Sequence, residues 1–162
     1  MMAHLLALAT STPPHRLGTE DAKSLARQAY GGRGVDLDRY MPVFDNAGIE
    51  SRALAMPMDW YLQPHGWNDR NEIFRRCALD LLAEAAEEAL DQAELDPSDV
   101  DALVVVSTTG VVTPSLDALL MERMPFRRDV LRTPIFGLGC AGGVSGLARA
   151  TMLARSMPGK TV

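Results

Sequence analysis

The sequence predicts an α/β fold in which helices cover a largely buried sheet. Apolar residues recur at three- and four-residue steps between Ile73 and Leu90, with charged residues between them, which is typical of one long amphipathic helix. Residues 100–107 then form a β-branched run flanked by turn residues, which is typical of a strand buried under helices. With 162 residues, 47% of them hydrophobic, the chain is long enough for one domain with a sizeable core.

The first part of the chain is expected to alternate between strand and helix. Residues 4–9 alternate small and large side chains as a buried strand does, and a Ser-Thr-Pro-Pro turn follows. Thr19 is a good N-cap for a helix over 19–29, which the glycines from Gly31 onward end. A second, short helix is expected over 36–46, and an extended segment over 49–56.

The rest of the chain continues this alternation. Both tryptophans and His65 lie in 59–67, which is expected to form a loop with hydrophobic anchors. The long helix should begin near Asn68 or Asp69 and end before Asp96. The elements expected after it are a strand (100–107), a helix (114–124), a strand (133–138), a helix (143–157) and, after a turn, the first residues of another strand at 158–162. We expect such a chain to be part of a longer fold.

Charge and cysteine content exclude several classes of protein. The net charge of −5 argues against a protein that binds nucleic acid electrostatically. No apolar run approaches the ~20 residues that cross a bilayer, so no membrane segment is expected. Two cysteines, Cys77 and Cys140, are too few for a disulfide framework and fit a reducing, cytoplasmic compartment. No Cys/His pair has the spacing of metal ligands, so we expect neither a metal nor a bound cofactor.

The glycine-rich turn Gly137-Leu-Gly-Cys-Ala-Gly-Gly143, between an expected strand and helix, is the candidate functional motif. It satisfies the G-x-G-x-x-G pattern of dinucleotide sites, but residues 143–162 lack the acidic residue that holds the ribose. The glycines could instead serve close packing around an inert thiol, which is the role we assign to Cys77 on the long helix. Alternatively, Cys140 is a nucleophile, because a helix N-terminus favours the thiolate. The residues alone leave these last two interpretations open.

The motifs resemble a known family. The segment from Pro134 to Arg149 resembles the nucleophile segment of bacterial type III polyketide synthases, the chalcone- and stilbene-synthase family. Asn-Ala-Gly-Ile-Glu-Ser-Arg (46–52), Gln-Pro-His-Gly-Trp (63–67) and Val-Val-Ser-Thr-Thr-Gly-Val-Val-Thr-Pro-Ser (105–115) support the resemblance in the same order. It implies a thiolase-like layered α/β/α half, with a mixed sheet covered by helices, in one N-terminal domain over 1–162.

The resemblance also implies an activity and its residues. The family condenses an acyl group, taken from a CoA thioester onto a cysteine, with the carbanion that malonyl-CoA forms on losing carbon dioxide. Cys140 corresponds to that nucleophile, and Thr108 and Thr109 match positions near the starter cavity. Thr113 falls where the family sends a side chain across a dimer interface, and Arg39 matches a basic residue at the CoA entrance. The expected small-molecule partners are therefore acyl-CoA and malonyl-CoA.

The family's mechanism also uses a His and an Asn, both of which match positions beyond residue 162. Of the three histidines here, His65 is expected to be a hydrogen-bonded structural residue. A complete site would then need a complementing C-terminal half, and the family's enzymes are homodimers. Two alternatives remain: an initiating ketoacyl-carrier-protein synthase, which shares the fold and the cysteine, and a non-catalytic thiolase-fold half that only binds a partner.

Overall fold

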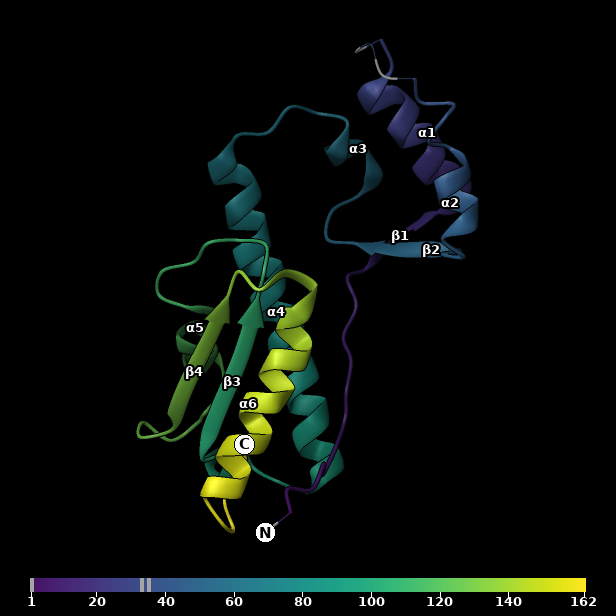
Figure 1. The fold of residues 1–162 in the computed structure, drawn as a ribbon. Coiled ribbons are helices and arrows are strands. Elements are labelled where there is room, and N and C mark those ends of the chain that lie inside the picture. The colour runs from purple at the N-terminus through teal and green to yellow at the C-terminus, as the bar shows by residue number, and fades with distance from the viewer. Residues whose placement is uncertain (1, 33, 35) are drawn as a thin grey trace. The chain divides into compact units, whose positions relative to one another are not determined.

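A computed structural model of the chain describes residues 2–32, 34 and 36–162 (Figure 1). These residues divide into two compact units. The small unit is Thr12–Arg70, and the large unit combines the N-terminal segment that ends at Ser11 with Asn71–Val162. We describe each unit by itself.

The small unit is built on an antiparallel pair of short strands. The strand β1 (His15–Gly18) pairs with β2 (Ser51–Leu54) in the register that sets His15 opposite Leu54. Its helices are α1 (Thr19–Tyr30), α2 (Pro42–Asn46) and α3 (Met58–Tyr61). The helix expected over 36–46 is confirmed only from Pro42, because turns occupy 38–41 and proline suits the first helical turn. The predicted loop over 59–67 contains most of α3.

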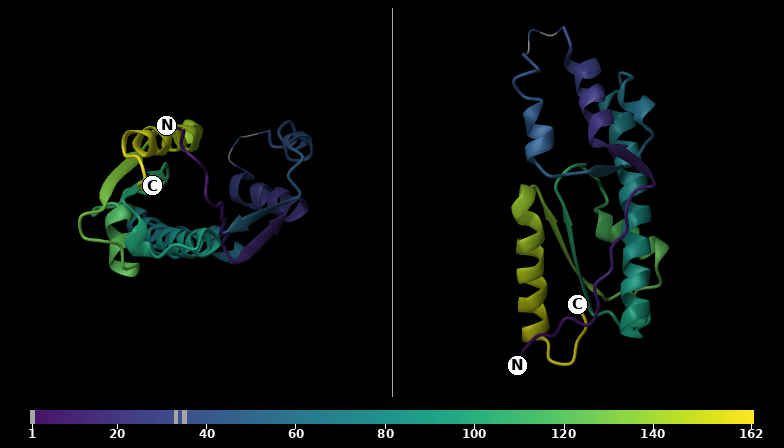
Figure 2. Two further views of the ribbon diagram at one scale, coloured as in Figure 1. Left: turned by 90° about the horizontal axis from the view of Figure 1, so that it is seen from below. Right: turned by 90° about the vertical axis from the view of Figure 1, so that its right-hand side faces the viewer.

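The large unit has a parallel pair of strands between helices. Its elements are α4 (Trp67–Ala93, from Asn71 onward), η1 (Pro97–Asp99), β3 (Ala102–Ser107), α5 (Leu116–Arg123), β4 (Leu131–Phe136), η2 (Gly139–Ala141) and α6 (Gly142–Ser156). The strands β3 and β4 are parallel, with Ala102 opposite Leu131 and Ser107 opposite Phe136. The helix α6 covers one face of this pair, and α4 and α5 lie on the other (Figure 2). The unit therefore has the α/β/α layers that the family resemblance implies.

The core of the large unit lies between the strands and the α4–α5 layer. Its buried members come from α4, the turn before β3, α5 and the loop after α5: Leu79, Ala83, Val100, Leu119, Leu120, Met124, Phe126 and Val130. Three members of the predicted stripe, Leu82, Ala86 and Leu90, pack partly buried against this core. The two α4 residues that are buried in it, Leu79 and Ala83, lie outside the predicted stripe. Cys77 is half-buried on the same helix.

On the opposite face, two glycines allow α6 to approach β3 closely. A Cβ atom at Gly142 would lie 2.8 Å from Cγ1 of Val106, and one at Gly146 would lie 2.5 Å from Cγ2 of the same valine. Both distances are too short for real carbon atoms. Glycine at these two positions therefore sets the distance between α6 and the sheet.

Two expectations about the sheet differ from the structure. Residues 4–9 are not a strand, because no described strand pairs with them, although their alternating pattern suits one. The described strands form one antiparallel and one parallel pair rather than a single mixed sheet. As an edge strand, β4 alternates exposed and half-buried residues, so its burial is less than the sequence predicts.

Candidate active site

The candidate site lies where the two parallel strands end. Because β3 and β4 run in the same direction, the residues that follow them meet at one edge of the sheet. The backbone N–H of Gly137 donates a hydrogen bond of 3.2 Å to the carbonyl oxygen of Ser107 and fastens the two ends together. Thr108 and the turn that carries Cys140 therefore begin side by side.

Cys140 lies in η2, directly between this strand end and α6. Its side chain is exposed and forms no disulfide. Gly137 and Gly139 have φ angles of 82° and 55°, a left-handed conformation that residues with a Cβ rarely adopt. The turn that presents Cys140 therefore requires glycine for backbone reasons alone, which removes the glycine pattern as support for a dinucleotide site.

The start of α6 offers backbone donors beside the thiol. The N-cap residue Ala141 makes no side-chain cap bond, and α6 carries no acidic residue in its first turn. The N–H of Gly142, the first residue of α6, already donates to the carbonyl oxygen of Gly139. The N–H groups that follow it in the first turn have no partner within the helix, so they can serve an anion or a carbonyl oxygen that gains charge. A thiol beside such donors has the surroundings that acyl transfer requires.

The structure brings one predicted substrate residue to this edge. Cγ2 of Thr108 lies 3.4 Å from the position a Cβ would take at Gly142, so the Thr108 side chain packs against the first residue of α6. Thr109 and Thr113 are exposed on the loop that follows β3. Arg39 is an exposed turn residue of the small unit, whereas Cys140 belongs to the large unit.

Two residues of α4 hold the loop that follows β3 and carries Thr109 and Thr113, and the sequence analysis identified neither of them. The side-chain amide of Asn71 donates to the carbonyl oxygen of Val111 at 2.9 Å and accepts from its N–H at 3.1 Å. A Cβ at Gly110 would lie 1.9 Å from Cδ1 of Phe74, so this buried glycine fits against the aromatic ring. No local pattern could reveal the Asn71 contact, because its partner lies 40 residues away.

A second missed feature is a small cavity of about 100 Å³ beneath the same loop. The fully buried Asp117 and the strand residue Ser107 both line it. Oδ2 of Asp117 accepts a 3.0 Å hydrogen bond from Nη1 of Arg132, while Oδ1 and the Ser107 hydroxyl are buried without a partner. The Asp117–Arg132 pair ties α5 to β4, the strand that leads to Cys140.

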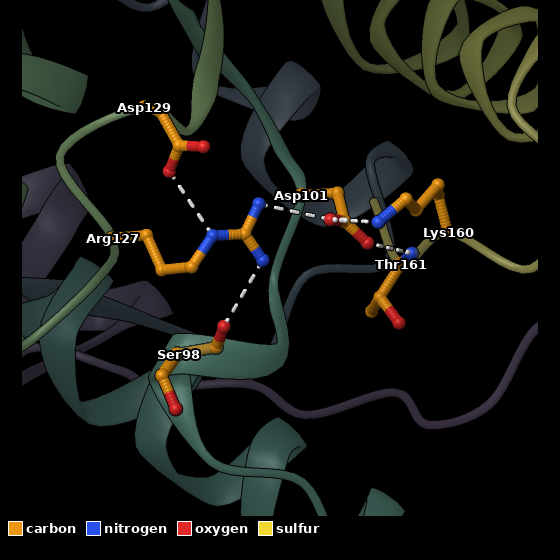
Figure 3. A network of polar contacts seen from close by, with 6 residues as sticks. All are labelled: Ser98, Asp101, Arg127, Asp129, Lys160 and Thr161. Carbon is orange, nitrogen blue, oxygen red and sulfur yellow. Dashed lines mark hydrogen bonds and ion pairs between the residues drawn. The ribbon is translucent and has the colours of Figure 1, made fainter.

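A network of charged residues around Asp101 lies at the opposite end of β3 (Figure 3). Oδ1 of Asp101 accepts hydrogen bonds from Arg127 and Lys160 at 3.0 and 3.1 Å, and Oδ2 accepts from the backbone N–H of Thr161 at 3.0 Å. The Thr161 bond, followed by Lys160 and Arg127, lowers the pKa of Asp101 to about 2. Because it lies at the end of β3 away from Cys140, we assign this network to holding the last residues against β3 rather than to the site.

His65 has the structural role that the sequence predicts. Its Nε2 lies 2.8 Å from the carbonyl oxygen of Trp60, and its ring stacks on the Trp60 indole at 3.9 Å between centroids. Among the described residues, no three His, Cys, Asp or Glu side chains converge as metal ligands. None of the described helices combines the length and apolarity needed to cross a bilayer.

Comparison with known proteins decides the family. Residues 57–162 match the family model of chalcone and stilbene synthases, N-terminal domain. The chain belongs to this family. The chalcone and stilbene synthase assignment agrees with the motifs quoted above and does not support the alternative of a ketoacyl-carrier-protein synthase.

Relatives place the chain among bacterial type III polyketide synthases. It is 41% identical over 143 residues to a 1,3,6,8-tetrahydroxynaphthalene synthase of Streptomyces peucetius subsp. caesius, covering 88% of this chain and 38% of the relative. It is 32% identical over 110 residues to the phloroglucinol synthase of Pseudomonas fluorescens, covering 68% of this chain and 32% of the relative.

A solved relative confirms the fold. The crystal structure of the 1,3,6,8-tetrahydroxynaphthalene synthase of Streptomyces coelicolor A3(2), a bacterial type III polyketide synthase, superposes with a TM-score of 0.90 at 31% identity. The match covers 98% of this chain and 45% of that one. The thiolase-like fold is therefore confirmed, and the chain spans less than half the length of these relatives.

Proposed function

We propose that Cys140 is the acyl-accepting nucleophile of a type III polyketide synthase. The observation that carries this proposal is the placement of an exposed thiol between the end of β4 and the start of α6, which has no side-chain cap, in a chain of this family. The Cys140 thiolate attacks the carbonyl carbon of an acyl-CoA. A new carbon–sulfur bond forms, the bond to CoA breaks, and CoA leaves as a thiol after taking up one proton.

The condensation then uses malonyl-CoA as the second substrate. Malonyl-CoA loses carbon dioxide, and the resulting enolate carbon attacks the acyl group on Cys140. A carbon–carbon bond forms and the Cys140 thiolate is released. The backbone N–H groups at the start of α6 support the negative charge on the oxygen in each step. No further cofactor takes part.

The remaining residues of the proposed site contact the substrates. Thr108 and Thr109 line the space for the starter acyl group, and the contact of Thr108 with the first residue of α6 supports this role. Thr113 reaches toward a second subunit of a homodimer, and Arg39 contacts CoA. Groups that polarise the thioester carbonyl and assist decarboxylation come from a complementing half outside residues 1–162.

Acyl transfer to the thiol tests this function without the second substrate. The chain is mixed with the C-terminal half of a type III polyketide synthase, incubated with acetyl-CoA and with longer acyl-CoA thioesters, digested, and mapped by mass spectrometry. The matched variants are Cys140→Ala and Cys77→Ala. We expect one acyl group on the Cys140 peptide, retained in Cys77→Ala and lost in Cys140→Ala. No adduct, or an adduct that persists without Cys140, contradicts the proposal and favours the non-catalytic binding half.

A further inference from the structure

The small cavity beneath the loop that follows β3 has a mixed lining. Its volume is about 100 Å³. Most of the lining is aliphatic and comes from β3, β4 and the loop between β3 and α5. Three of the lining residues have polar side chains, namely Ser107, Ser115 and Asp117. The last residue of β3 and the second residue of α5 therefore meet at one enclosed space.

Two buried oxygen atoms of these residues lack a hydrogen-bond partner. They are Oδ1 of Asp117 and the hydroxyl oxygen of Ser107, and neither has a partner among the described residues. Asp117 is 0% exposed, and Arg132 bonds only to its other oxygen, Oδ2, at 3.0 Å. A polar atom that is buried without a partner is costly, so nearly all such atoms in native proteins bond to protein or to ordered water. Both oxygens thus require a partner that the described side chains do not supply.

Size and charge favour water as that partner. The volume exceeds the roughly 10–15 Å³ that one water molecule needs. Arg132 already pairs with the carboxylate of Asp117, so a second cation gains little there, and the same carboxylate repels an anion. Ser115 offers a third polar group, because its side chain makes no cap bond to α5. Three polar partners are the usual number for a buried water.

We propose that this cavity is a binding site for ordered water, which donates a hydrogen bond to Oδ1 of Asp117 and bonds to the hydroxyl of Ser107. These two residues flank the segment 108–116, which carries the three threonines of the proposed site. The water would therefore join the two ends of this loop at its base, while Asn71 holds its middle from α4. Water binding at this place is independent of the chemistry of Cys140.

Nuclear Overhauser effects between water and protein test the proposal in the full chain. The reporters are the methyl groups of Val105 and Val112, which line the cavity. Ser107→Val fills the cavity and removes its hydroxyl, whereas the control Thr151→Val removes an exposed hydroxyl of α6. We expect cross-peaks with the sign of a bound water in the parent chain and the control, and cross-peaks at least ~5-fold weaker in Ser107→Val. Circular dichroism checks that each variant folds.

Xenon provides a second measurement that needs no variant. Xenon enters dry apolar cavities and does not displace well-bonded water, so we expect no xenon-induced shift of the Val105 and Val112 methyl signals. Such a shift, or the absence of water cross-peaks in the parent chain, would overturn the proposal. Equal cross-peaks in Ser107→Val would do the same. Shifts that follow the concentration of Na⁺ or K⁺, but not of tetramethylammonium at equal ionic strength, would show that a cation fills the cavity instead.

Discussion

The close contact between α6 and β3 can be probed with two alanine substitutions in the same helix. At Gly146 the new methyl group would lie 2.5 Å from Cγ2 of Val106, whereas at Gly143 it would meet nothing within 4 Å. Valine is stiff about χ1, so its methyl group cannot turn away without cost. We therefore expect Gly146→Ala to push α6 away from β3, and Gly143→Ala to leave the packing unchanged.

The magnitudes follow from two opposing effects. Alanine in place of glycine stabilises a helix by up to ~1 kcal/mol in each variant. The gain should be smaller at position 143, because Gly143 lies in the first turn of α6. Overpacking costs roughly 1–3 kcal/mol and applies only at Gly146. Gly143→Ala should thus raise the free energy of unfolding slightly. The free energy of unfolding of Gly146→Ala should be about 1–3 kcal/mol lower than that of Gly143→Ala.

Urea unfolding followed by circular dichroism measures both free energies. Adding Val106→Ala to Gly146→Ala removes the methyl group responsible for the clash, so the double variant should lose less stability than the sum of the two single changes. Equal effects of the two glycine substitutions, or strict additivity with Val106→Ala, would refute the close-contact explanation of how α6 and Cys140 are positioned.

Three further outcomes are expected. Asn71→Ala removes two hydrogen bonds to Val111, so unfolding free energy should drop by about 1–3 kcal/mol and the Val111 amide should exchange faster by NMR. Because the folded pKa of Asp101 lies below its ordinary value of 3.8, the stability that Asp101 contributes is present above pH 3.8 and is lost as the pH falls toward 2. The midpoint of thermal unfolding should therefore fall over this pH range, and it should fall less in Asp101→Asn. Leu120→Ala, at a site 3% exposed, should cost roughly 2–5 kcal/mol in urea unfolding, and an unchanged midpoint would contradict the core described above.

The sequence predicted correctly those elements that can be recognised from residues close together in the chain. The stripe that includes Leu82, Ala86 and Leu90 marks the long helix because a helix brings every third or fourth residue to one face. The β-branched run that becomes β3, and the glycine turn around Cys140, are equally visible from neighbours in the sequence. These features sufficed to place the candidate nucleophile at a strand-to-helix turn.

Features that depend on distant partners could not be predicted. Residues 4–9 have the pattern of a strand, but a strand needs a neighbour to pair with, and no described strand offers one. Asn71 bonds to the backbone of Val111, which carries no side-chain signal of the contact. The need for glycine at 146 comes from Val106, on another element, so no neighbouring residue in the sequence reveals it.

Competition between acylation and alkylation at the two thiols would decide the proposed role of Cys140. Iodoacetamide labelling of the chain near neutral pH is followed by peptide mass spectrometry, with and without prior incubation with acyl-CoA and a complementing C-terminal half. We expect the exposed Cys140 to react at least ~10-fold faster than the half-buried Cys77, and acyl-CoA to protect Cys140 alone. Equal rates at the two cysteines, faster labelling of Cys77, or no protection of Cys140 would contradict its assignment as the acyl-accepting nucleophile.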